Sequence, residues 1–195
     1  MKKPLIVIFL VLLLDQVSKI LVKTTMAIGE SIPVFGKWFY ILFIENNGMA
    51  FGLEISGANW GKIFLGLFRI VAVVFLFWLL FKLTKKNVKF GPLFGIALII
   101  AGAIGNIIDG MFYGLIFDYS GFMQGRVVDM LYFPLFTFPE WVPWLGGEIF
   151  FSPVFNIADS AITIGIFYLI IFQWSFIRNI ESIFGIEKQK NGERD

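Results

Sequence analysis

The stretch FNIADSAITIGIFYLIIFQWSFI, residues 155–177, decides the fold of this chain. It is almost continuously apolar, and it is long enough to cross a bilayer as a helix, which takes about 20 residues. Near its beginning, however, it carries Asp159. A charged side chain within a membrane span costs roughly 2.5–3.5 kcal/mol on insertion scales, which makes Asp159 a candidate functional residue.

The composition of the whole chain also indicates a membrane protein. Of its 195 residues, 58% are hydrophobic, 18% are aromatic and only 15% are charged. A soluble domain of this size cannot bury so much apolar surface. The sequence has no histidine and no cysteine, which excludes a histidine-based triad, a thiol nucleophile, a Cys/His zinc site and a disulfide. Only carboxylates could hold a metal, and we expect neither a metal nor another cofactor.

Three further apolar runs reach the length of a span, so the sequence predicts an all-α core of four transmembrane helices. The four runs cover about residues 4–22, 63–81, 90–108 and 155–177. Lys and Arg cluster before the first run, between the second and third, and after the fourth. By the positive-inside rule, this pattern puts both termini in the cytoplasm. We expect a single integral membrane domain over residues 1–180 and a polar cytoplasmic tail over residues 181–195.

The two longer connections, about residues 24–62 and 109–154, would then face outward. The first contains KWFYILFI, residues 37–44, whose aromatic and β-branched side chains predict strands in a small periplasmic β-rich region. The second is crowded with aromatic residues and prolines between Phe133 and Trp144. Aromatic residues at this density suit the headgroup region of a membrane, so we expect an interfacial aromatic loop there.

Several polar side chains fall at the outer ends of these spans. They form pairs three or four residues apart on one helix, so the members of each pair share a face. The pairs are Asp15 with Lys19, Asn106 with Asp109, and Asn156 with Asp159. Asp129 adds a carboxylate in the outer loop. The carboxylates therefore gather near the outer boundary of the membrane, whereas scattered structural polar residues would not be expected to segregate in this way.

Each pair also has a purely structural explanation, which for Asn106 and Asp109 is that they are ordinary polar groups at a helix end. Asp15 and Lys19 would form an ion pair, because charges within a membrane usually pair. Asn156 would cap the fourth helix with Asp159 in its first turn, where the helix dipole favours a carboxylate. These explanations leave the common depth of the pairs unexplained. Arg69, inside the second span, either reaches toward water or meets one of the acids, and the sequence leaves both open.

Paired aspartates are the obvious hydrolytic machinery left in such a chain. Two carboxylates that face each other across a small gap cannot both ionise easily, so one keeps a proton while the other acts as a base toward water. Ser18 and Lys19 are a poor alternative, because adjacent residues of a helix point in different directions.

Five motifs, in order, resemble those of bacterial lipoprotein signal peptidase, the type II signal peptidase, over roughly residues 14–164. They read DQVSK (15–19), NNGMAFG (46–52), GNIID (105–109), VVD (127–129) and FNIADSA (155–161). The resemblance implies an intramembrane aspartyl endopeptidase that removes the signal peptide of diacylglyceryl-modified prolipoproteins, cutting before the lipidated cysteine. It also implies the bacterial inner membrane as the location, with the active site near the outer face.

The resemblance assigns the catalytic pair to Asp129 and Asp159. It implies supporting or substrate-binding roles for the other polar positions of the motifs, which are Asp15, Lys19, Asn46, Asn106, Asp109 and Asn156. The chain departs from the family at Gly110, where arginine is usual, and we expect Arg126 to substitute for it. The segment 130–156 is also longer than the resemblance implies, and its aromatic residues would form an interfacial flap.

Within the catalytic pair, we expect Asp159, in the first turn of a helix, to activate the water and Asp129, on a loop, to hold the shared proton. The expected partners are the lipid-modified prolipoprotein and membrane lipids, with no nucleic acid, and the expected state is a monomer. A small proton-coupled transporter or channel is the competing hypothesis, and it predicts carboxylates distributed across the membrane.

Overall fold

The computed structural model describes residues 1–46 and 59–184 of the chain. Within these ranges, three helices are long and apolar enough to cross a membrane. They are α1 (Lys2–Thr25), α2 (Asn59–Lys85) and α3 (Phe90–Ile108). Large apolar side chains remain exposed on α1 and α2, as on helices that face lipid. Residues 47–52 of the second motif and most of the predicted tail lie outside the described residues.

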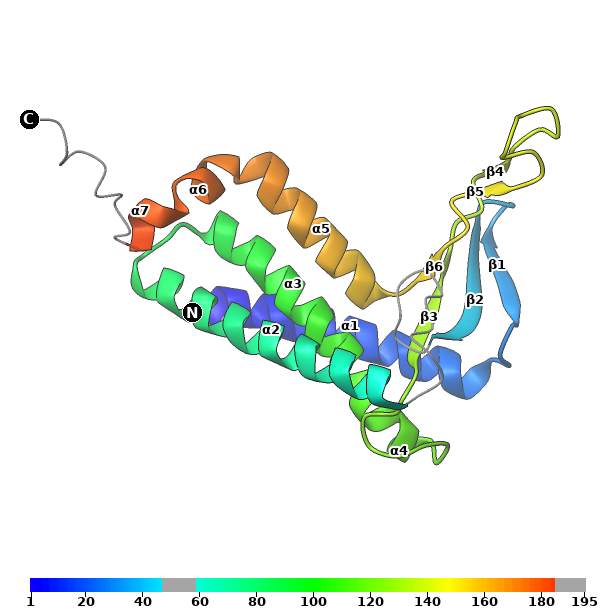
Figure 1. Ribbon diagram of the computed structural model, residues 1–195, viewed down its shortest axis with the longest axis horizontal. Coiled ribbons are helices and arrows are strands. Elements are labelled where there is room, and N and C mark those ends of the chain that lie inside the picture. The colour runs from blue at the N-terminus through cyan, green and yellow to red at the C-terminus, as the bar shows by residue number, and fades with distance from the viewer. Residues whose placement is uncertain (47–58, 185–195) are drawn as a thin grey trace, which may run out of the picture.

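The central helix of the bundle is α3, which packs against α1, α2 and α5 (Ile157–Phe172) (Figure 1). Small residues let α3 and α5 approach closely, as is common between membrane helices. A Cβ atom added at Gly102 would collide with the backbone oxygen of Ala158, and one at Gly105 would lie 3.1 Å from the Ala158 side chain. This close contact sets the beginning of α5, and with it Asp159, against the outer part of α3.

The fourth predicted span is shorter than expected. Helix α5 has 16 residues, which correspond to about 24 Å of helix, whereas a bilayer core is about 30 Å thick. It begins only after Asn156 because the preceding residues form a strand, and it ends at Phe172, before Gln173. The short helices α6 (Trp174–Arg178) and α7 (Ile180–Phe184) follow. The prediction of four transmembrane helices is therefore not confirmed, and the described residues contain three long apolar helices.

A four-stranded antiparallel sheet stands at one end of the helices, in the order β1-β2-β3-β6 (Figure 1). Its strands are β1 (Ser31–Phe35), β2 (Phe39–Asn46), β3 (Val127–Tyr132) and β6 (Val154–Phe155). Strand β2 confirms the predicted β-rich region. The expectation that Asp129 lies on a loop is wrong, because Asp129 belongs to β3 and pairs with Ile44 of β2. The first four residues of β3 are all buried, so the strand lacks the alternation that would have revealed it.

The aromatic segment between β3 and β6 contains a second, two-stranded sheet. Its strands are β4 (Phe136–Thr137) and β5 (Ile149–Phe150). The rings of Phe136 and Phe150 stack with centroids 4.7 Å apart. Trp141 and Trp144, in the connection between the strands, are 81% and 100% exposed. This aromatic hairpin, residues 136–150, extends from the sheet beyond the beginning of α5 (Figure 1).

Candidate active site

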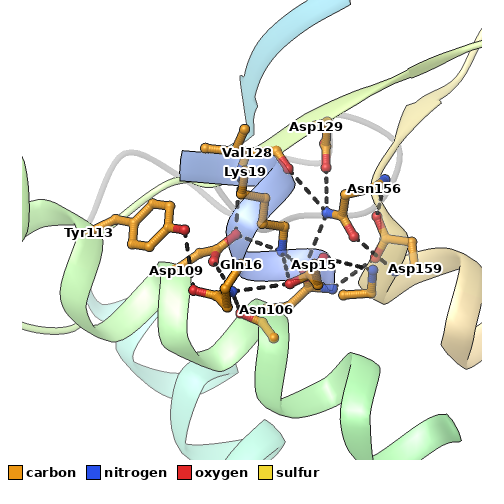
Figure 2. A network of polar contacts seen from close by, with 12 residues as sticks. Asp15, Gln16, Lys19, Asn106, Asp109, Tyr113, Val128, Asp129, Asn156 and Asp159 are labelled. Carbon is orange, nitrogen blue, oxygen red and sulfur yellow. Dashed lines mark hydrogen bonds and ion pairs between the residues drawn. The ribbon is translucent and has the colours of Figure 1, made fainter. Parts of the chain in front are cut away.

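The polar residues of the predicted motifs meet where α1, α3 and α5 approach strand β3 (Figure 2). Six of them are buried: Asp15, Lys19, Asn106, Asp109, Asp129 and Asn156. Asp159 is half-buried. Among the described residues, no buried side-chain nitrogen or oxygen lacks a hydrogen-bond partner. Because every buried polar atom among these residues is hydrogen-bonded, the cluster avoids the free-energy penalty of unpaired polar groups and is held in one arrangement.

Lys19 is the positive centre of this cluster. Its Nζ lies 2.9 Å from Asp15 Oδ2 and 2.8 Å from Asp109 Oδ2, and the Lys19 side chain has no exposed surface. The third proton of the ammonium group is donated to Asn106 Oδ1 over 3.1 Å. The predicted ion pair within α1 is thus confirmed, but it is one part of a larger arrangement. A lysine has three donors, and all three here point at residues of the predicted site.

Gln16 and Tyr113 also belong to the cluster, although sequence reasoning did not single them out. Gln16 Nε2 donates to Asp15 Oδ2 and Asp109 Oδ1, each over 3.0 Å. The Tyr113 hydroxyl donates to Gln16 Oε1 over 3.2 Å. Tyr113 ends the π-helical turn η2 (Asp109–Tyr113), which continues α3. The one available signal was that Gln16 is a polar residue within an apolar run; the π-turn that positions Tyr113 has no sequence signature of its own.

Asp15 connects α1 to the beginning of α5. Its Oδ1 accepts a hydrogen bond of 2.8 Å from the backbone N–H of Ala158, in the first turn of α5. Free N–H groups and the helix dipole make this position favourable for a carboxylate. Asp15 therefore fixes the end of the helix that carries Asp159.

Asn156 caps α5, as predicted. Its Oδ1 accepts from the Asp159 N–H over 2.8 Å, and Asp159 Oδ2 accepts in return from the Asn156 N–H over 3.3 Å. The structure adds a second role for the same side chain. Asn156 Nδ2 donates to Asp129 Oδ1 over 2.8 Å and to Asn106 Oδ1 over 3.3 Å. One amide thus contacts both of the predicted catalytic aspartates.

Amide groups occupy the remaining oxygens of these two aspartates. Asn106 Nδ2 donates to Asp159 Oδ1 over 2.8 Å, and Asn46 Nδ2, at the end of β2, donates to Asp129 Oδ2 over 3.2 Å. Every oxygen of the two carboxylates therefore receives a hydrogen bond from an amide. These contacts come from asparagines on a strand, a helix and a helix cap, so both carboxylates are held in orientation from several elements.

The environment of Asp129 disfavours its ionised form. Burial, and secondly the nearby carboxylate of Asp159, raise the pKa of Asp129 to about 7. The hydrogen bonds from Asn46 and Asn156 and the charge of Lys19 act in the opposite direction and offset part of the increase. Loss of hydration penalises a buried carboxylate, and a second negative charge nearby penalises it further. Near neutral pH, Asp129 can therefore carry a proton.

Arg126 lies in a different cluster. Its Nη1 is 3.2 Å from Glu45 Oε2, and its guanidinium lies over the ring of Tyr119 at 5.6 Å from the centroid. Glu45 also pairs with Lys23. The arginine that lines a cavity together with Gly110 is instead Arg69 of α2. Arg69, Gly110 and Asn106 line the same cavity between α2 and α3.

A bundle of membrane-spanning helices around a buried set of carboxylates and amides defines a membrane-embedded enzyme. The chain matches the family described as signal peptidase (SPase) II over residues 7–176. It is 50% identical over 184 residues to the lipoprotein signal peptidase of Porphyromonas gingivalis strain ATCC 33277, covering 84% of this chain and 79% of that one. It is 36% identical to the lipoprotein signal peptidase of Amoebophilus asiaticus, covering 83% and 73%. The chain belongs to the signal peptidase II family, a family of proteases.

Two solved structures share the fold. One is a bacterial membrane enzyme determined by the in meso method at 2.3 Å, with a TM-score of 0.62, 26% identity and coverage of 100% of this chain and 96% of that one. The other, determined by the same method at 1.9 Å, has a TM-score of 0.60, 29% identity and coverage of 89% and 93%. Both structural similarities are consistent with a membrane enzyme, and the alternative of a transporter or channel is not supported.

Proposed function

We propose that this chain is an intramembrane aspartyl endopeptidase that removes the signal peptide of diacylglyceryl-modified prolipoproteins, cutting before the lipidated cysteine. Membership of the signal peptidase II family and the lipoprotein signal peptidases among its relatives support the substrate class. One observation supports the assignment of an aspartyl catalytic mechanism. The carboxylates of Asp129 and Asp159 both contact Asn156, so that two acids from different elements converge on one place.

In the proposed mechanism, Asp129 begins with a proton and Asp159 without one. Asp159 takes a proton from a water molecule, and the water oxygen attacks the scissile carbonyl carbon. Asp129 gives its proton to the carbonyl oxygen, which produces a neutral tetrahedral intermediate. When the C–N bond breaks, the proton now on Asp159 passes to the leaving amine, and a hydroxyl proton returns to Asp129. Each of the two steps moves two protons, one through each aspartate, and the second step returns both aspartates to their starting states.

The other members of the cluster would support this pair. The Asn106 side chain and the Asn156 backbone N–H hold the carboxylate of Asp159, and the side chains of Asn46 and Asn156 hold that of Asp129. Lys19 pairs with both Asp15 and Asp109, which offsets part of the negative charge that these carboxylates would place beside the catalytic pair. Orientation of reacting groups in this way can account for several kcal/mol of a catalysed barrier.

We propose one integral membrane domain over residues 1–180 in the bacterial inner membrane, with both termini and the tail 181–195 in the cytoplasm. Helix α5 would serve as the fourth span together with the residues that follow it, since Ile157–Phe172 is apolar. The site would then lie near the outer face, at the depth where a lipid-anchored substrate meets the membrane surface. The aromatic hairpin would rest in the headgroup region, where tryptophan is favoured.

Purified protein in detergent, incubated with a diacylated prolipoprotein, tests this function. We expect release of the signal peptide with the new N-terminus at the lipidated cysteine, as determined by mass spectrometry of both products. An unmodified prolipoprotein is the matched control. Absence of cleavage of the lipidated substrate, or cleavage at another bond, would contradict the proposal. The mass of the protein–detergent complex, measured by light scattering, tests the proposed monomer.

A further inference from the structure

Arg69 is a charged residue well inside α2, the second apolar helix. Charge at such a depth is costly, so an arginine there is a candidate for a function. Arg69 is half-buried and lines the cavity between α2 and α3. The polar side chains of that cavity include Lys62, Arg69 and Asn106, and apolar side chains such as Ile107 and Met111 complete it.

This cavity adjoins the predicted catalytic pair. Asn106 forms part of its wall and also donates the 2.8 Å hydrogen bond to Asp159. Val127, another wall residue, lies two positions before Asp129 on β3. The wall is also open at Gly110, where an added Cβ would meet no atom within 4 Å.

A peptide bond can be cut only where the chain is extended enough to enter the site. A signal peptide unwound at membrane depth loses the helical hydrogen bonds of its backbone, and each unsatisfied carbonyl group there costs several kcal/mol. The enzyme must therefore supply donors beside the cleaved bond. Arginine is well suited, because its planar guanidinium presents five N–H donors in a fixed fork and keeps its charge.

We propose that Arg69 is a substrate-positioning residue, whose guanidinium donates hydrogen bonds to backbone carbonyls of the unwound signal peptide on the N-terminal side of the cleaved bond. This inference rests on the proposed peptidase function. The N-terminal side is favoured because the signal peptide is the part of the substrate that lies within the membrane, as Arg69 does. Lys62, also on the cavity wall, lies seven residues earlier on α2, about two helical turns toward its beginning.

Binding is measured first without cleavage, in the Asp129→Asn background. A fluorescent diacylated prolipoprotein peptide is titrated into this variant alone and combined with Arg69→Met or Arg69→Lys. Because hydrogen bonds to a charged group contribute about 1.5–3 kcal/mol, we expect Arg69→Met to weaken binding about tenfold or more. Arg69→Lys should recover only part of the loss, since it keeps the charge without the fork. Lys85→Met, a loss of charge at the other end of α2, should leave the Kd unchanged.

A second measurement identifies the acceptor. Substrates that each carry one thioamide, a weaker acceptor, within the three residues before the cut are compared on the otherwise wild-type enzyme and on Arg69→Met. At one of these three substrate positions, the thioamide should raise KM for the enzyme with Arg69 but should not change KM for Arg69→Met. Arg69→Lys replaces Arg69→Met in both measurements if the methionine variant does not fold, as judged by its thermal midpoint.

The outcomes separate this inference from the proposed function. Cleavage by Asp129→Asn would contradict the aspartyl mechanism, whatever Arg69 does. If Asp129→Asn is inactive and the folded Arg69 variants bind the peptide within twofold of their parent, the role of Arg69 is overturned. If every thioamide raises KM by the same factor for the enzyme with Arg69 and for the Arg69 variant, the assignment of Arg69 to backbone carbonyls is overturned.

Discussion

Asn156 donates a hydrogen bond of 2.8 Å from Nδ2 to Asp129 Oδ1. Asp129 lies on β3, whereas Asn156 is the cap of α5, so this contact joins the sheet to the helix bundle. The oxygen of the same amide caps α5 through the Asp159 N–H. One side chain therefore contacts the carboxylate of Asp129 and the backbone of Asp159, and its loss should affect the proton equilibria of the pair as well as its geometry.

The pH dependence of cleavage should show this coupling. With the pKa of Asp129 raised to about 7, its proton is lost as the pH rises through that value, so kcat/KM should decline above about pH 7. The Asn156 hydrogen bond favours the ionised form of Asp129, so Asn156→Ala should raise the pKa of Asp129 and move the basic limb to higher pH. The same substitution weakens the α5 cap, so it should also raise the lower apparent pKa, which sets the acid limb of the pH–rate profile.

Complete pH–rate profiles of the wild type and Asn156→Ala check this prediction, with Thr163→Val on the exposed face of α5 as the control. The limbs belong to the pair rather than to one residue, so both must be recorded. A basic limb that stays in place or moves to lower pH in Asn156→Ala would contradict the role given to this hydrogen bond.

The same carboxyl should make stability depend on pH. The folded-state pKa of Asp129, about 7, is above the ordinary value of 3.8. Its contribution to the free energy of unfolding is therefore fully present below about pH 4 and is lost as the pH rises through 7. Asparagine does not ionise, so Asp129→Asn does not lose stability in this way. The thermal midpoint of the variant minus that of the wild type should therefore be larger at pH 8 than at pH 4. Equal differences at the two pH values would count against a buried, protonated Asp129.

Lys19 should be essential for stability. Lys19→Met leaves Asp15 and Asp109 buried without their shared counter-ion. Breaking a buried ion pair by removing one partner typically costs about 3–5 kcal/mol, so we expect a large decrease in the thermal midpoint in detergent. Lys86→Met, at an exposed position after α2, is the control. A midpoint for Lys19→Met within a degree or two of the control would mean that the cluster does not depend on this ammonium group.

The proposed topology has a direct test with reporter fusions. A reporter placed within residues 85–89 or after Arg194 should be cytoplasmic, and one placed within residues 138–144 should be external, because Lys and Arg residues concentrate at the inner ends of the spans. The hairpin position is decisive. A cytoplasmic signal from residues 138–144 would place Asp129 on the wrong side of the membrane for a substrate anchored in the outer leaflet.

Much of the site could be predicted because its residues are polar groups in apolar surroundings. Asp15, Lys19, Asn106 and Asp159 stand out for this reason, and helical periodicity shows which of them share a face. That they meet at one place depends on how the helices pack. The close approach of Gly102 of α3 to Ala158 of α5 has no signal in the hydropathy pattern.

Other features required the three-dimensional structure. Strand β3 is buried on both sides, so Asp129 looked like a loop residue. Gln16 takes part because its amide reaches from α1 to Asp109 of η2, a contact between residues far apart in sequence. The sequence could not show that Arg126 pairs with Glu45 or that Arg69 lines a cavity with Gly110, because both depend on how the side chains are directed in the folded chain.

The central claim, that Asp129 and Asp159 carry out the hydrolysis, is tested most directly by the turnover of Asp129→Asn and Asp159→Asn on a diacylated prolipoprotein. Each variant removes one of the two carboxyl groups while keeping nearly the same shape, so each should fold, insert and bind substrate but show no measurable cleavage. Asp15→Asn, which weakens the contact with Lys19 rather than the pair, should retain more activity than either. Turnover above a few per cent of the wild-type rate in Asp129→Asn or Asp159→Asn would contradict the assignment of the catalytic pair.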